Sequence, residues 1–301
     1  MSSLFRLGQV LRGGLGKNQA GESVVIKGVQ GHPRVENERD ILKHFQDRSL
    51  YLRPLIDEIE EPSDPPTIVL KYLEDHLLNA SIEKTLSRQE LKYVSRRILE
   101  ALKVLHDKCY VHTDVKLDNV LVNYREGDIR FSDVQLSDLG GACPANSKYA
   151  RAGTPVGAPM WTSPEVIMET PWNTATDIWS FGTVLISLIY GGNFNLFRPR
   201  TVSSGHEEYG LEVLKQQFRY FGPFPAKYEE IASSQTIAAI LYLMEEIPQS
   251  QTTPFNRTTT KEVCKEDREL IGKIMMLDWR DRPTAGELLE NEWFKEDRNE
   301  E

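Results

Sequence analysis

The chain is poor in cysteine, which holds many small secreted and metal-bound folds together. Its 301 residues include three cysteines, Cys109, Cys143 and Cys264, which are far apart and odd in number. This spacing offers neither a metal-ligand pair nor a disulfide framework, so a reducing compartment is the simpler expectation. Stability must come from a hydrophobic core, and a hydrophobic fraction of 40% suffices for one large or two modest domains.

A positive charge excess and long apolar runs are also missing. There are 36 basic against 45 acidic residues, a formal net charge of −9. This balance argues against nucleic acid as a partner and is compatible with basic peptides, although acidic surfaces commonly serve solubility alone. The most apolar segment, residues 178–190, is too short to span a bilayer, and the first residues lack the apolar run of a signal peptide. We therefore expect no membrane contact and a cytoplasmic or nuclear location.

The pattern changes from strand-like to helical near residue 71. Four segments of the first part predict strands, with a flexible glycine turn at residues 12–16 and a helix after Pro33: residues 7–11, 23–27, 52–59 and 67–70. Further on, helical spacing dominates, and two capping boxes mark helix starts at residues 87–90 and 284–287. Short strands are expected at residues 120–122 and 129–136. The sequence thus predicts an α+β fold with a small β-rich lobe and a large, mostly helical lobe.

One polar stretch carries the residue types of a catalytic loop. Asp114, Lys116 and Asn119 lie within six residues, and Asp138 follows Asn119 by 19 residues. Asp114 can accept the proton of an attacking hydroxyl, and Lys116 can neutralise charge on a transferred phosphoryl group. Asn119 and Asp138 offer the oxygen ligands that Mg²⁺ prefers. Together they supply a base, a charge clamp and two metal ligands, the set that phosphoryl transfer from a nucleotide requires.

Two aspartates compete for the second metal position, because Asp133 and Asp138 both follow a serine. We favour Asp138, since Gly140 lets the backbone turn after it and Leu139 can pack into the core. Asp133 is expected in the β-turn that precedes the strand leading to Asp138.

These motifs resemble the catalytic loop and the metal-binding motif of eukaryotic protein kinases of the serine/threonine type. Ser163-Pro164-Glu165, the helix start at Asp177 and the arginine Arg282 resemble further kinase motifs, in the right order along the chain. The resemblance implies structural roles for five residues, including a buried pair between Glu165 and Arg282: His112, Leu139, Glu165, Asp177 and Arg282.

In the first lobe, Lys27 resembles the phosphate-binding lysine and Glu38 its helix partner, with Glu36 as the competing carboxylate. The resemblance implies nucleotide contacts for seven residues: Lys27, Glu38, Gly13, Gly14, Gly16, Leu70 and Leu73. The glycine turn lies only eleven residues before Lys27, which is short for a glycine-rich loop and a full second strand.

Some of these motifs indicate a particular subgroup of the serine/threonine kinases. His112-Thr113-Asp114, the run after Asp138 and residues 221–225 resemble SR-protein kinases and their relatives in the cyclin-dependent and MAP kinase group. The family implies a kinase domain over residues 1–297, with an N-lobe to about 70, a hinge at about 71–75 and a C-lobe at about 76–297, followed by a charged tail at 298–301. It also implies ATP and Mg²⁺ as cofactors, a monomer, and a protein substrate with a basic or Arg/Ser-rich sequence.

Two departures from the family pattern bear on activity. Thr113 stands where most members have the arginine that binds an activation-segment phosphate, which predicts activity without that phosphorylation. Ala158 stands where many have a threonine that bridges the catalytic aspartate and lysine, with Thr154 as a candidate substitute. The leading hypothesis is an ATP-dependent serine/threonine protein kinase. The alternatives are a pseudokinase that acts as a binding module and, more weakly, a small-molecule phosphotransferase, which would generally lack Ser163-Pro164-Glu165 and Arg282.

Overall fold

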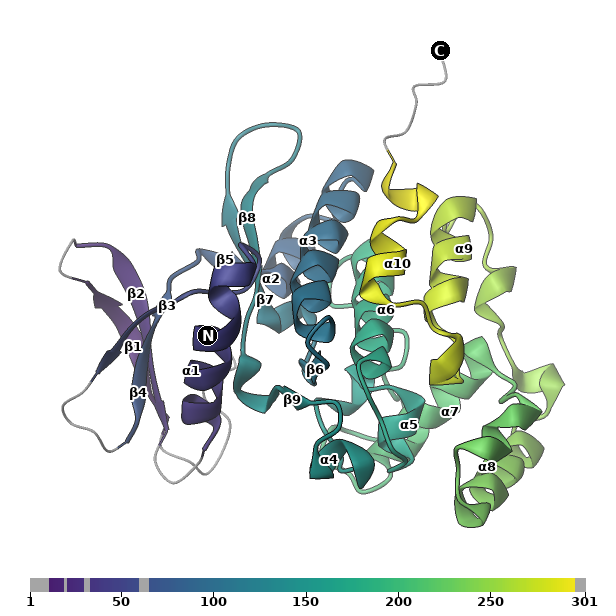
Figure 1. The fold of residues 1–301 in the computed structure, drawn as a ribbon. Coiled ribbons are helices and arrows are strands. Elements are labelled where there is room, and N and C mark those ends of the chain that lie inside the picture. Colours follow the sequence, from purple (N-terminus) through teal and green to yellow (C-terminus); the bar gives the residue numbers. More distant parts are fainter. Residues whose placement is uncertain (1–10, 19–20, 30–32, 60–64, 296–301) are drawn as a thin grey trace.

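The computed structural model describes residues 11–18, 21–29, 33–59 and 65–295. Its first part is an antiparallel sheet in the order β1-β2-β4-β3. The strands are β1 (Leu11–Lys17), β2 (Ser23–Val29), β3 (Leu55–Ile59) and β4 (Thr67–Lys71). Helix α1 (Arg34–Phe45) crosses beside this sheet, on the side that faces the helical lobe in Figure 1.

The apolar spacing of α1 explains why it packs where it does. Val35, Leu42 and Phe45 are fully buried and lie on one face of the helix. Pro33 precedes the first helical residue with φ −74°, which suits the start of a helix. In β2, the β-branched Val24 is buried, as expected of a strand in a packed sheet.

The glycine-rich segment belongs to strand β1, so the predicted turn was wrong. Gly13 lies opposite Lys27 and Gly16 opposite Val24 in the ladder with β2. The pairing of two strands outweighs the conformational freedom that makes glycine common in turns. The connection to β2 instead passes through residues 18–22, of which 19 and 20 lie outside the described residues. Most of the strand expected at residues 7–11 also lies outside them.

The second part of the chain is largely helical. It opens with the long helix α3 (Arg88–His106) and with six shorter elements: β5 (Asp75–His76), α2 (Leu77–Glu83), β6 (Tyr110–Val111), β7 (Val120–Tyr124), β8 (Phe131–Leu136) and β9 (Cys143–Pro144). Seven helices complete the described residues: α4 (Lys148–Arg151), α5 (Pro164–Ile167), α6 (Ala175–Tyr190), α7 (Tyr209–Phe221), α8 (Ser234–Glu246), α9 (Lys265–Ile274) and α10 (Ala285–Leu289). Figure 1 shows α3, α6, α9 and α10 gathered away from the sheet.

Both predicted capping boxes form and start helices of this lobe. Ser87 accepts from the amide of Glu90 at the start of α3, and Thr284 caps α10 in the same way. Helix α6 is buried along nearly its whole length, with Trp179 at 0% exposure. The predicted α+β fold, a small β-rich lobe and a large helical lobe, is confirmed.

A short bridge connects the two lobes behind the hinge. Leu52 pairs with Leu136 at the end of β8, and the Arg53 amide donates to the Leu136 carbonyl at 2.9 Å. Asp133 lies within β8, so its placement in a preceding turn was wrong. Its carboxylate binds Lys71 Nζ at 2.9 Å, because the pairing of β7 with β8 turns it toward the hinge.

Candidate active site

Three charged side chains from separate elements meet between the lobes. Lys27 Nζ of β2 lies 2.6 Å from Glu38 Oε2 of α1 and 2.8 Å from Asp138 Oδ1. Glu38 is 1% exposed, whereas Glu36 is exposed and takes no part in this contact. The short connection from β2 to α1 is therefore long enough to bring Lys27 and Glu38 together.

The ion pairs in this cluster change the pKa of two of its members. Burial alone would lower the pKa of Lys27, but Glu38 and Asp138 raise it well above its usual value. Burial would raise the pKa of Asp138, yet the charge and hydrogen bond of Lys27 lower it to about 2. Lys27 is thus a fixed cation and Asp138 a fixed anion at neutral pH.

A side-chain amide holds α1 against the turn that follows Asp138. Asn37 Nδ2 donates to the carbonyls of Gly140 at 3.1 Å and Ala142 at 2.9 Å. A Cβ on Gly140 would lie 3.1 Å from the Arg34 carbonyl oxygen, so a side chain there would force the two segments apart. Asn37 and Gly140 therefore fix the position of Glu38 relative to Asp138.

Asp177, at the start of α6, holds the catalytic loop in place through hydrogen bonds. Its carboxylate accepts from the amides of His112 at 2.7 Å and Thr113 at 2.9 Å, and it contacts His106 Nε2 at 2.9 Å. His112 is fully buried, and its Nε2 lies 3.1 Å from the Ser137 carbonyl oxygen. These bonds join the loop to the residue before Asp138.

Within the loop, three of the expected residues contact one another. Asp114 Oδ2 accepts from Lys116 Nζ at 2.6 Å and from Asn119 Nδ2 at 3.0 Å. Asn119 also donates to the Asp114 carbonyl at 2.8 Å, which fixes the curvature of the loop. Asp114 Oδ1 is buried and has no hydrogen-bond partner. One carboxylate oxygen is thus oriented by a cation and an amide, and the other is left to accept a proton or a hydroxyl.

Thr113 lies in the catalytic loop, and Ala158 follows Gly157, whose added Cβ would be 3.8 Å from Asp114 Oδ1. Thr113 has φ +73°, and its hydroxyl lies so close to Gly141 that a Cβ there would be 2.7 Å away. Ala158 carries no hydroxyl for Asp114 Oδ1. Thr154 is not a substitute in the structure, because its carbonyl accepts from Trp172 Nε1 at 2.9 Å and its side chain forms no bond with Asp114. The unpartnered oxygen of Asp114 follows from this arrangement.

Each of the two expected metal ligands has an oxygen without a hydrogen-bond donor among the described residues. Asp138 uses Oδ1 for Lys27, and Asn119 uses only its nitrogen, so Asp138 Oδ2 and Asn119 Oδ1 accept no hydrogen bond from the described residues. These are hard oxygen donors of the kind that Mg²⁺ takes from protein while phosphates and water complete its shell. The residues present fit a magnesium ion that is bound together with a phosphorylated ligand.

A second ion pair lies deep in the large lobe. Glu165 accepts from both terminal nitrogens of Arg282, at 2.7 and 2.8 Å, and both side chains are almost fully buried. Arg282 also donates to backbone carbonyls and lies 5.0 Å over the Trp179 ring. This pair anchors α5, which contains Glu165, to the segment that contains Arg282.

The other expected nucleotide contacts lie along the small lobe. Gly13 is directly opposite Lys27, and Leu70 and Leu73 are 0% and 6% exposed at the end of β4 and in the hinge. Leu139 is fully buried beneath the Asp138 turn. Sequence reasoning missed two residues in this region, Asn37 and Arg53. The first could have been noticed as an amide next to Glu38, but nothing in the local pattern marks the second.

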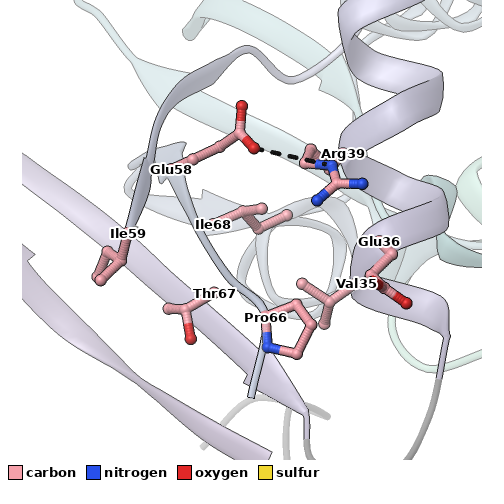
Figure 2. Close-up of a pocket in the computed structure, with 8 residues that line it drawn as sticks. All are labelled: Val35, Glu36, Arg39, Glu58, Ile59, Pro66, Thr67 and Ile68. Carbon is pink, nitrogen blue, oxygen red and sulfur yellow. Dashed lines mark ion pairs between the residues drawn. The ribbon is translucent and has the colours of Figure 1, made fainter. Parts of the chain in front are cut away.

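A pocket of about 220 Å³ lies between α1 and the strands β3 and β4. Figure 2 shows Arg39 of α1 directed toward Glu58 of β3 across it, with their charged atoms 3.7 Å apart. Val35 and Ile68 form its apolar wall. It shares α1 with the cluster at Lys27 but none of the expected catalytic residues, so it lies outside the candidate active site.

No helix in the described part of the chain is both long and apolar enough to cross a membrane.

The sequence is similar to those of several serine/threonine-protein kinases. The kinase pak-2 of Caenorhabditis elegans, a serine/threonine-protein kinase, is 31% identical over 159 residues, which is 52% of this chain and 28% of pak-2. The serine/threonine-protein kinase CLA4 of Saccharomyces cerevisiae is 26% identical over 197 residues, 61% of this chain and 22% of CLA4. The serine/threonine-protein kinase STE20 of Kluyveromyces lactis is 32% identical over 125 residues, 41% of this chain and 12% of STE20.

The chain therefore spans less than a third of the length of these relatives. Their names are of the PAK and STE20 type and do not support the expected resemblance to SR-protein kinases. The family described as Protein kinase domain matches residues 15–294, from β1 to the last described turn. With that match over most of its length, the chain belongs to the protein kinase domain family.

Proposed function

We propose that the chain is an ATP-dependent serine/threonine protein kinase that transfers the γ-phosphoryl group to protein hydroxyls. The observation that carries this proposal is the meeting of Lys27, Glu38 and Asp138 beside a loop whose Asp114 keeps one oxygen unpartnered. Phosphoryl transfer depends mainly on positioning and charge stabilisation, and these contacts provide both. A pseudokinase is less well supported, because the lysine, glutamate and aspartate contacts are complete.

The substrate hydroxyl oxygen would attack the γ-phosphorus while the bond to the bridging oxygen of ADP breaks. Asp114 Oδ1 would receive the hydroxyl proton, and Lys116, 2.6 Å from the other oxygen, would offset negative charge on the phosphoryl group. Lys27 would hold phosphate oxygens in line. Asn119 and Asp138 would hold a magnesium ion, which would supply positive charge to offset that of the phosphates.

The proposed kinase domain covers residues 1–297, with a hinge at about 71–75 and the tail at 298–301, which lies outside the described residues. The net charge of −9 favours a basic protein substrate for a chain acting as a monomer. A preference for Arg/Ser-rich sequences is a narrower hypothesis, and phosphorylation of a peptide library of graded basic content tests it. The same reasoning proposes no nucleic-acid or membrane partner and a cytoplasmic or nuclear location.

The reaction is tested by removing the base or the phosphate-binding cation. Asp114→Asn and Lys27→Met should each lower phosphate transfer to a basic peptide mixture by at least about a thousandfold, because each removes a charge that the transition state needs. Radiolabelled phosphate incorporation measures the rate, and circular dichroism confirms folding. Asp118→Asn is the matched control, since this neighbouring carboxylate accepts no hydrogen bond from the described residues. Full turnover in both test variants would reject the proposal.

Thr113 leads to a prediction about regulation by phosphorylation, which dephosphorylation of the protein tests. A threonine has no charge to bind an activation-segment phosphate, and Asn37 already fixes α1 to the segment after Asp138. Complete dephosphorylation of the active protein should therefore change its rate less than twofold. Mass spectrometry confirms removal of phosphate, and a reversible loss of more than tenfold would contradict the prediction.

A further inference from the structure

A loop at residues 156–162 passes beside the catalytic loop before α5 begins. Gly157 in this loop has φ +71°, a conformation that glycine adopts without steric cost. A Cβ added to it would lie 2.6 Å from the Thr113 carbonyl oxygen and 3.8 Å from Asp114 Oδ1. The 156–162 loop therefore lies against the catalytic loop, next to the Asp114 oxygen that has no hydrogen-bond partner.

Three consecutive carbonyls of the 156–162 loop accept hydrogen bonds from side chains of the large lobe. The donors come from three places in the fold: α6, α7 and the segment between them. The bonds run from Ser180 Oγ of α6 to Trp161 at 2.8 Å, from Gln217 Nε2 of α7 to Thr162 at 2.8 Å, and from Asn195 Nδ2 to Met160 at 3.4 Å. The helical lobe thus fixes the end of the loop that leads into α5.

The position of Thr162 is passed on to Gly157 through the loop itself. The Thr162 hydroxyl lies 3.2 Å from the Val156 carbonyl oxygen and 2.9 Å from the Ala158 carbonyl oxygen. Gly157 stands between these two residues, so its distance from Asp114 depends on where Thr162 is held. A side chain that holds the Thr162 carbonyl therefore acts on the surroundings of Asp114 Oδ1.

Gln217 is the least expected of the three donors, because its surroundings do not call for a polar side chain. It is 0% exposed, and its neighbours Leu214 and Phe218 on α7 are buried and apolar. Its Nε2 donates to Thr162, but its Oε1 is buried and accepts no hydrogen bond from the described residues. A buried acceptor without a donor costs stability. The amide is therefore better explained by the loop that it holds than by the stability of the helix.

The 156–162 loop borders the side of the site that a protein hydroxyl would approach. Asp114 Oδ1, the oxygen proposed to receive the hydroxyl proton, lies beside Gly157, and both Gly157 and Pro159 are exposed. The proposed phosphate-binding cation, Lys27, has its ion pairs with Glu38 and with the residue before Leu139 instead. A shift of the loop should therefore affect the protein substrate before it affects the nucleotide.

We propose that Gln217 is a positioning residue for the protein substrate, which acts through Thr162 and Gly157 and touches no reacting atom. This inference rests on the proposed kinase function and deepens it. The loop, held by Gln217, keeps the acceptor hydroxyl beside Asp114 Oδ1. Loss of the bond to Thr162 lets the loop move, which weakens productive binding of the protein substrate and leaves nucleotide binding as it is.

The test is steady-state transfer from Mg²⁺-ATP, by the full chain, to the peptide of a basic mixture that the wild type phosphorylates best. Gln217→Met keeps the length of the side chain and removes its donor. It should raise the KM for peptide about tenfold and change the KM for ATP less than about twofold. The urea midpoint should stay close to that of the wild type, because removal of the unpartnered Oε1 offsets the lost bond to Thr162.

Gln216→Met is the matched control, because it makes the same chemical change one residue earlier on α7. Gln216 is half-buried and forms no hydrogen bond with the described residues, so both KM values should stay unchanged. Ser180→Ala removes the donor to the Trp161 carbonyl and should raise the KM for peptide in the same direction. It carries the test if Gln217→Met fails to fold.

The proposal is overturned if the wild type is active and Gln217→Met has the same KM for peptide as Gln216→Met. It is also overturned if the KM for ATP rises as much as the KM for peptide, since the effect would then be a general loss of structure. If Gln217→Met does not fold, an unchanged KM for peptide in Ser180→Ala overturns it. A wild type that transfers no phosphate would instead overturn the proposed function, and this inference with it.

Discussion

The ion pair of Arg282 and the cluster at Lys27 use similar chemistry in opposite surroundings. Arg282 and Glu165 are 0% and 1% exposed, and every terminal nitrogen of the arginine has an acceptor. Lys27 is 13% exposed and Asp138 38%, and Asp138 keeps an oxygen without a partner. The first pair fixes part of one lobe, while the second joins three elements and retains capacity for a ligand. Satisfaction of every donor indicates structure, and a spare acceptor indicates function.

The largest effect on stability is expected at the buried pair. Arg282→Ala leaves the Glu165 carboxylate charged and buried, which costs about 3–5 kcal/mol in such pairs. Urea denaturation followed by tryptophan fluorescence measures the loss. Arg280→Ala is the comparison, because Arg280 also binds carboxylates but is 26% exposed, and it should cost less than Arg282→Ala. Equal losses in the two variants would show that burial does not distinguish these pairs.

A smaller and different effect is expected where α1 meets the Asp138 turn. Asn37→Ala removes two hydrogen bonds and should cost about 1–2 kcal/mol of stability. It should lower kcat about tenfold with little change in KM for peptide, because Glu38 loses its fixed position relative to Asp138. Steady-state kinetics and hydrogen exchange of residues 139–142 measure these effects.

The matched control for this variant is Glu36→Ala. Glu36 precedes Asn37 on the same helix, and its side chain is exposed. It should change neither kcat nor the exchange rates. A variant at Asn37 with normal kcat would show that the helix is positioned by packing alone.

The smallest effect is a pH dependence at the junction between the lobes. Asp138 has a pKa of about 2, below its ordinary 3.8, because of Lys27. A lowered pKa in the folded state means that this carboxylate stabilises the fold above about pH 4 and loses that contribution as the pH falls through 2. Unfolding free energies measured between pH 5 and pH 2 should therefore converge for the wild type and Lys27→Met. Parallel curves for the two proteins would contradict this assignment.

Much of the site could be predicted because its residues lie in contiguous motifs. Asp114, Lys116 and Asn119 are close in sequence, so local geometry alone brings them together. Lys27 and Asp138 are 111 residues apart, and only the resemblance to a family placed them side by side. The contacts of both groups are present in the structure, while their catalytic roles stay predictions.

Other features could not be predicted, because tertiary pairing decides them. Glycines commonly form turns, yet pairing with β2 draws Gly13 into a strand. Asp133 precedes the apolar end of its strand and has no local feature that separates a turn from a ladder position. Arg53 finds the acceptor for its Nε in the Lys71 carbonyl, on a strand that follows it in the chain and folds back beside it. Such contacts depend on how segments that are distant in the sequence pack together, and local propensity does not predict that packing.

The two consecutive glycines after Leu139 have a consequence for how freely the gene can vary. Gly140 lies against the Arg34 backbone and Gly141 against the Thr113 hydroxyl, whereas Gly14 and Gly272 have no atom within 4 Å of an added Cβ. A missense change at Gly140 inserts a side chain between α1 and the turn after Asp138, and one at Gly141 inserts a side chain against the catalytic loop. Changes at the last two codons meet open space. Allelic variation should thus be tolerated less at Gly140 and Gly141 than at Gly14 and Gly272.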